Sequence, residues 1–184
     1  MRCDNQALAF SAARHRAFPS VYVYSFNRTY QSPGYSNFAC DAPPTASRPL
    51  GDPDGEYLKC HAGEIIYTVG SLRRWRKDRD GLDTPFARLI VDYWSAFART
   101  GDPNPEEEFL RARGYQSTLD QLEVNGGSWE PVNADRPQLR WLQWGEGEKM
   151  VGFQDVKQCE ALGLPSNFFE SPQRTRLVRR ETAG

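Results

Sequence analysis

One stretch decides the fold of this chain of 184 residues: YWSAFARTGDPN, residues 93–104. It closes a predicted helix that starts at Pro85, because proline is favoured as the first helical residue, and that ends near Arg99. Thr84 is the expected N-cap, and Gly101 supplies the left-handed residue that stops a helix. The apolar side chains recur at helical spacing, at Phe86, Leu89, Ile90, Tyr93, Trp94 and Phe97. The pattern predicts a helix that buries a broad aromatic face.

The segments before this helix predict a second helix, a strand and a long loop. Residues 4–16 are expected to be helical, with Asp4 as the cap and a mild apolar stripe at Ala7, Leu8, Ala12 and Ala13. The run VYVYSF, residues 21–26, is typical of a strand buried on both faces, as in a parallel sheet. Residues 31–56 are rich in proline and glycine and predict a loop.

The segments after the helix predict a hairpin and a short helix. Residues 101–137 have the composition of loops. Residues 139–144 and 150–153 read as the two arms of a hairpin around a turn at 145–147, and a short helix is expected over 156–162. We expect one domain over residues 1–170, followed by a disordered basic tail at 171–184.

Composition excludes several classes of protein. The chain has 23 basic and 24 acidic residues and a net charge of −1, which gives no electrostatic case for binding nucleic acid. No run approaches the roughly 18 apolar residues that span a bilayer. No signal peptide follows Met1, so the chain would be cytoplasmic if Met1 is the true start. The four cysteines lack zinc-site spacing, which leaves two disulfides or free buried thiols open.

Two histidines are the candidates for acid–base chemistry. His15 lies in a polar helical segment and is expected at the surface. His61 ends a long loop, a common place for catalytic side chains. The sequence contains no Gly-x-Ser-x-Gly, no HGGG-type oxyanion loop and no phosphate-binding glycine loop. His61 and Glu64 make a poor zinc pair without a third ligand, so we expect neither a metal nor a cofactor.

Three segments resemble, in order, the C-terminal third of type B carboxylesterases, the family that includes cholinesterases and fungal lipases. They are VYVYSF at 21–26, HAGEI at 61–65 with Val69-Gly70 after it, and YWSAFARTGDPN at 93–104. Trp129-Glu130-Pro131 fits the family's following W-P, and the likeness covers roughly residues 3–170. The resemblance implies an α/β class, as the C-terminal part of an α/β-hydrolase fold whose central strands are missing.

The resemblance also implies roles for individual residues. His61 would be the catalytic base, which takes the proton of a serine that attacks an ester carbonyl and later protonates the leaving alcohol. Glu64 matches the family's glutamate just after that histidine and would be a buried group supporting it, not the triad acid. A capping or surface carboxylate is the alternative for Glu64. The family's serine, acid and oxyanion glycines all precede this portion.

The resemblance also implies a pairing of the cysteines and a cellular location. In secreted relatives, cysteines near Cys3 and Cys159 are joined, so Cys3–Cys159 is the leading disulfide. Cys40–Cys60 would then close the loop that delivers His61. The family implies a secreted protein, and the complete enzyme would act on a small-molecule or lipid ester.

Three functional hypotheses remain open. The chain is part of a carboxylic-ester hydrolase that supplies His61 and is inactive alone, or it is a non-catalytic binding or adhesion member of the same family, or it is a degenerate product. The first requires the His61 imidazole to lie near the carboxyl ends of the sheet strands and not to face bulk water. We also expect poor solubility of the chain alone, because a strand without neighbours exposes an apolar edge.

Overall fold

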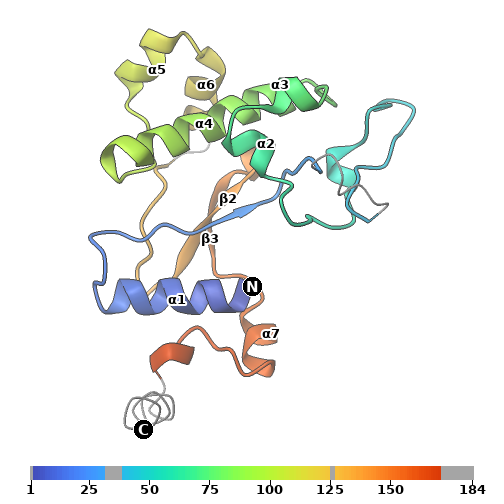
Figure 1. Cartoon of the computed structure of the whole chain (residues 1–184). Helices are drawn as coiled ribbons and strands as arrows, with labels where there is room; N and C mark the ends of the chain where they lie inside the picture. Colours follow the sequence, from blue (N-terminus) through green and yellow to red (C-terminus); the bar gives the residue numbers. More distant parts are fainter. Residues whose placement is uncertain (1, 32–38, 125–126, 171–184) are drawn as a thin grey trace, which may run out of the picture. The chain divides into compact units, whose positions relative to one another are not determined.

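The computed structural model describes residues 2–31, 39–124 and 127–170 (Figure 1). The chain divides into two compact units. The first comprises Met1–Tyr24, Glu130–Arg140 and Met150–Gly184, and the second comprises Ser25–Trp129 and Trp141–Lys149. The predicted basic tail at 171–184 lies outside the described residues. No helix in the described ranges is long and apolar enough to cross a membrane.

Helices and one small sheet make up the described chain, in agreement with the predicted α/β class. The helices are α1 (Arg2–Arg14), α2 (Ile65–Thr68), α3 (Leu72–Trp75), α4 (Asp83–Thr100), α5 (Glu107–Arg113), α6 (Gln116–Val124) and α7 (Val156–Ala161). The strands are β1 (Tyr24–Phe26), β2 (Gln138–Leu142) and β3 (Lys149–Gly152), and they form a sheet in the order β1-β2-β3. Short 3₁₀ turns lie at Pro53–Gly55, Gly145–Gly147 and Phe168–Glu170.

The sheet confirms the predicted hairpin but not the predicted buried strand. β2 and β3 are neighbours joined by a short connection, as the sequence indicated. β1 is shorter than the run at 21–26, and its Tyr24 is 46% exposed. The reason is that β1 lies at an edge, with β2 as its one neighbour among the described strands. Val21 still accepts a backbone hydrogen bond from Val132, at 2.7 Å, so the chain remains extended there.

Helix α4 provides the core of the second unit. It lies against α2, α3 and α6 (Figure 1). The predicted aromatic and aliphatic face is buried over most of its length: Phe86, Leu89 and Ile90 are 0% exposed and Tyr93 is 1% exposed. Phe97, near the C-terminal end, is 50% exposed and departs from that prediction. The helix is held mainly by the burial of this face, at about 1.5–3 kcal/mol for each large side chain.

The two ends of α4 are fixed by different devices. Gly101 ends the helix in the left-handed region, with φ 77°, as predicted. At the other end the prediction of Thr84 as N-cap is wrong, because the helix already begins at Asp83. The Asp78 carboxylate accepts the backbone N–H groups of Gly81, Asp83 and Thr84, at 2.7, 3.2 and 2.8 Å. Asp78 therefore caps the helix from a preceding loop, five residues before Asp83.

The TGDPN motif turns the chain back onto α4. The Thr100 hydroxyl donates to the carbonyl of Ala96, at 2.9 Å, and accepts the N–H of Asp102, at 3.0 Å. The Asn104 side chain accepts the N–H of Trp129, at 2.7 Å, and donates to its carbonyl, at 3.0 Å. The Trp129 ring meets Tyr93 edge-on, with centroids 5.4 Å apart. The motif is therefore a structural clamp.

Helices α5 and α6 lie in the segment for which the sequence predicted only loops. Each is short and buries few apolar side chains, such as Leu110 in α5 and Leu119 in α6, at 0% and 6% exposure. So few apolar positions give no readable period. Gly114 ends α5 with φ 72°, and Glu107 pairs with Arg111 one turn later on the same helix.

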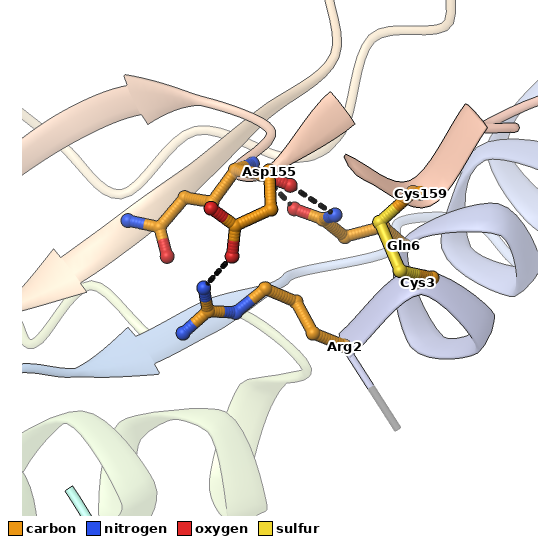
Figure 2. Close-up of a disulfide and its surroundings, with 6 residues drawn as sticks. Arg2, Cys3, Gln6, Asp155 and Cys159 are labelled. Atoms are coloured by element: carbon orange, nitrogen blue, oxygen red, sulfur yellow. Dashed lines mark hydrogen bonds and ion pairs between the residues drawn. A yellow bond between two sulfur atoms is a disulfide. The ribbon is translucent and has the colours of Figure 1, made fainter. Parts of the chain in front are cut away.

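In the first unit, α1 is fixed by a covalent and a polar contact (Figure 2). Cys3 is joined to Cys159 of α7, with Cα atoms 5.4 Å apart. Gln6 donates to the Gln154 carbonyl, at 2.9 Å, and accepts its N–H, at 2.7 Å. These contacts place Gln6 in the buried face and leave Leu8 61% exposed, so the predicted apolar stripe of this helix is wrong in its register.

Both predicted disulfides are present. The second, Cys40–Cys60, has Cα atoms 5.5 Å apart and lies wholly in the second unit. Residues 3 and 159 are separated by 156 positions and residues 40 and 60 by 20. In the chain-entropy model the first cross-link removes about 5 kcal/mol of unfolded-state freedom and the second about 3 kcal/mol.

We predict that a non-reduced proteolytic digest yields two cross-linked peptide pairs, one holding Cys3 with Cys159 and one holding Cys40 with Cys60. Replacing Cys3 and Cys159 together by serine should lower the free energy of unfolding by about 2–5 kcal/mol. Mass spectrometry and urea denaturation measure the two quantities. Four alkylatable thiols in the native chain would contradict the pairing.

Candidate active site

His61 lies at the tip of a tight turn that precedes α2. The N–H of Gly63 donates to the Cys60 carbonyl, at 3.2 Å, which places His61 and Ala62 at the two central positions. Ala62 has φ 66°, the left-handed conformation that the third residue of a type II turn requires. An alanine there is strained by about 1 kcal/mol. The backbone beside His61 is therefore held in one uncommon conformation.

The turn is tied to the segment that leaves the carboxyl end of β1. The Tyr30 N–H donates to the Gly63 carbonyl, at 2.9 Å. A Cβ added to Gly63 would lie 2.9 Å from the Cβ of Thr29, so only glycine allows this approach. On the other side of His61, Cys60 is anchored by its disulfide to Cys40. Covalent and hydrogen-bonded contacts thus hold the turn both before and after His61.

A buried ion-pair network contacts the segments that anchor the His61 turn. Arg79 donates hydrogen bonds to the Asp83 carboxylate from Nε and Nη2, both at 2.8 Å. Its remaining donors reach the Glu56 carboxylate, at 2.8 Å, and the Thr29 carbonyl, at 2.7 Å. Tyr67 of α2 donates to Asp83, at 2.7 Å. The Arg79 guanidinium therefore joins three segments. They are the segment at Thr29, the loop at Glu56 that precedes His61 and, through Asp83 and Tyr67, helix α2.

Further side chains neutralise the network. Arg28 donates from Nε to Asp83, at 2.9 Å, and also pairs with Asp80. Lys59 pairs with Glu56. The cations are Arg28, Lys59 and Arg79 and the anions are Glu56, Asp80 and Asp83. Because the charges match, the network remains ionised although Arg79 and Asp83 are 1% and 0% exposed.

The pKa values follow from this arrangement. Burial opposes ionisation of Asp83, but the hydrogen bonds and charge of Arg79, with the charge of Arg28, outweigh it and lower the Asp83 pKa from 3.8 to about 2. Burial and the negative charge of Asp83 raise the pKa of Tyr67 well above 10.0. The Tyr67 hydroxyl therefore stays protonated and works as a hydrogen-bond donor to Asp83.

The predicted site residues occupy contrasting positions. The His61 side chain is exposed, contrary to the expected shielding, and no described residue forms a hydrogen bond or ion pair with its imidazole. Glu64 is half-buried at the N-cap position of α2, and its carboxylate makes no cap hydrogen bond. The structure does not connect the two side chains. Their catalytic roles stay predictions, because the serine and acid that would contact His61 are not among these 184 residues.

Little in the sequence predicts the ion-pair network. The run Asp78-Arg79-Asp80-Gly81-Leu82-Asp83 is the one local signal, and an alternating charge run is usually a solvated surface. Asp78, Asp80 and Asp83 bring carboxylate oxygens within 4.8 Å of one another. Asp80 and Asp83 are engaged by arginines, and Asp78 caps α4. We therefore assign no metal to this group.

We predict that Gly63→Ala destabilises the chain by about 1–3 kcal/mol, because the new Cβ must push Thr29 away from the turn. Gly127→Ala is the matched control, since a Cβ there meets nothing within 4 Å. Urea denaturation of both variants gives the comparison. Equal stability of the two would show that the turn does not depend on this close approach.

We predict that Asp83→Asn lowers the unfolding free energy at neutral pH by about 3–5 kcal/mol, because it leaves buried arginine charge unpaired. The low folded-state pKa of Asp83 stabilises the fold above pH 4, and this contribution is lost as the pH falls toward 2. Between pH 4 and 2 the unfolding free energy of the variant should therefore fall by about 2 kcal/mol less than that of the parent. Asp135→Asn, at an exposed aspartate, should leave both quantities unchanged.

Comparisons with known proteins identify the chain as a family member. Residues 1–158 match the model of the carboxylesterase family, whose fold is the α/β hydrolase. A search of curated proteins gave no match. The matched range contains the His61 turn, the ion-pair network and the TGDPN clamp, and it covers most of the 184 residues. The chain belongs to the carboxylesterase family.

Proposed function

We propose that this chain is the C-terminal portion of a serine carboxylesterase and supplies the histidine of its catalytic triad. The observation that carries the proposal is the position of His61 on an anchored turn. The side chain is exposed there, and the turn lies within the range matched to the family. A general base must present its imidazole to a nucleophile in a fixed geometry. The anchors on both sides of His61 fix its backbone. The ring itself is exposed in this chain, which does not meet the requirement that it be shielded from bulk water, so the proposal requires the serine-bearing portion to cover it.

His15 does not compete for the role. It is exposed just after the end of α1, and its Nε2 lies 2.9 Å from the Glu170 carboxylate. That carboxylate also lies 3.6 Å from Arg14. His15 thus belongs to a surface ion-pair group of the first unit, and it serves as the matched control for His61.

The chain alone is expected to be inactive toward esters. The sequence contains no Gly-x-Ser-x-Gly and no oxyanion glycine loop. General-base help contributes about 10²–10⁴ in rate, and this help needs a nucleophile to act on. Oxyanion stabilisation alone is worth about 10²–10³ per donor. In this chain alone His61 has neither a serine to activate nor a stabilised oxyanion to act with.

The setting and the substrate follow from family and disulfides. Two disulfides within one chain favour an oxidising, extracellular compartment. The family favours a small-molecule ester as substrate. Glu64 is proposed as a group that supports the histidine once the serine-bearing portion covers it. A non-catalytic binding role is the alternative, and loss of ester hydrolysis in an otherwise complete fold would distinguish it.

We predict that residues 1–170, joined in frame behind the serine-bearing portion of an active type B carboxylesterase, restore hydrolysis of p-nitrophenyl butyrate. In that chimera His61→Ala should lower kcat/KM by at least about 10³-fold, because base and serine act as a unit. His15→Ala should leave it within about twofold. Labelling of the serine by a fluorophosphonate should fall in parallel with the rate.

Two results would overturn the proposal. One is a chimera whose activity and labelling survive His61→Ala. The other is a correctly folded chimera, shown by circular dichroism and a cooperative thermal transition, that neither hydrolyses the ester nor labels. The isolated chain should show no ester hydrolysis that depends on His61.

A further inference from the structure

A pocket of about 290 Å³ opens in the second unit, away from the residues that anchor the His61 turn. Its lining comes from Gly70 and α3, from α4, and from the junction of α5 with α6. Residues that line it include Gly70, Arg73, Arg88, Val91, Arg113 and Tyr115. No aspartate or glutamate of the described ranges lines it. Three guanidinium groups therefore face a space that no acidic side chain shares.

One of the three arginines is neutralised within the protein. Arg113 pairs with Asp92, which is 0% exposed and also accepts the Thr118 hydroxyl, at 3.0 Å. No described residue forms an ion pair with Arg73 or Arg88. The pocket thus retains two positive charges that its own walls do not balance.

The Tyr115 ring contacts two of these three cations. The guanidinium carbons of Arg88 and Arg113 lie 4.6 and 4.4 Å from its centroid. Cation–π contact with the ring restricts the orientation of both guanidinium groups. An anion in the pocket would accept paired hydrogen bonds from the planar Arg88 group, whose orientation the ring already restricts.

We propose that this pocket binds a small oxyanion, a carboxylate or a phosphate group carried by a compact molecule. The volume lies at the lower end of the range for small-molecule sites, which limits the ligand to a few heavy atoms beyond the anionic group. Arg88 is the central ligand, because it is half-buried, stacked and free of a carboxylate partner. Arg73 is exposed at the rim of the pocket, where its charge attracts an anion and its guanidinium supplies further hydrogen-bond donors.

The test is calorimetric titration of the full chain, fused to a soluble carrier protein, with inorganic phosphate in one arm and butyrate in the other. Sodium chloride at equal ionic strength and the carrier alone are the blanks. Saturable binding of either anion is expected, and the stronger arm identifies the group that the pocket prefers. Arg88→Gln should weaken binding at least about tenfold, and Arg88→Lys should fall between, since it keeps the charge but loses the planar fork.

Arg111→Gln is the matched control. Like Arg88→Gln, it removes one positive charge, here from α5. Arg111 is paired with Glu107 and does not line the pocket. Arg73→Gln tests the rim without risk to folding, because that side chain is exposed. A non-saturable response equal to that of chloride would overturn the proposal. So would binding that Arg88→Gln and Arg73→Gln leave unchanged while circular dichroism shows the fold intact. Either result is independent of the esterase chimera.

Discussion

The buried pair of Asp83 and Arg79 is the interaction on which the surroundings of His61 depend. Arg79 is 1% exposed, and in the interior an unpaired guanidinium would cost several kcal/mol. Asp83, Glu56 and the Thr29 carbonyl all reach this guanidinium at once. Satisfying this charge therefore selects the positions of three segments that are distant in the sequence. The His61 turn rests on these segments and takes its position from them.

The motif that best identifies the family has no part in this network. YWSAFARTGDPN ends α4, and its Asn104 returns the chain to Trp129 through two backbone hydrogen bonds. These contacts need neither a serine nor a substrate. The residues that mark the family are thus different from the residue proposed for catalysis. A chain can keep the clamp, and with it the fold of this region, whatever has happened to the nucleophile.

Local pattern explains what the sequence could predict. α4, the stop at Gly101 and the hairpin follow from periodicity and turn residues, and the disulfide pairing followed from the family resemblance. Interactions across long separations were not readable. Arg79 meets partners 23 and 50 residues away at Glu56 and Thr29, and Gln6 meets Gln154 across 148 residues. Likewise α5 and α6 are too short for their few apolar side chains to show a period.

The strained backbone beside His61 adds a last constraint. Ala62 is held at φ 66°, where an L-residue is disfavoured by about 1 kcal/mol, and Gly63 tolerates no Cβ against Thr29. Stability alone would not favour this turn, because relaxed turns close a loop without strain. Strain that the surrounding contacts enforce is typical of sites where the direction of one side chain matters. Here the neighbouring side chain is His61, and the strained backbone fixes the position from which the proposed base would project.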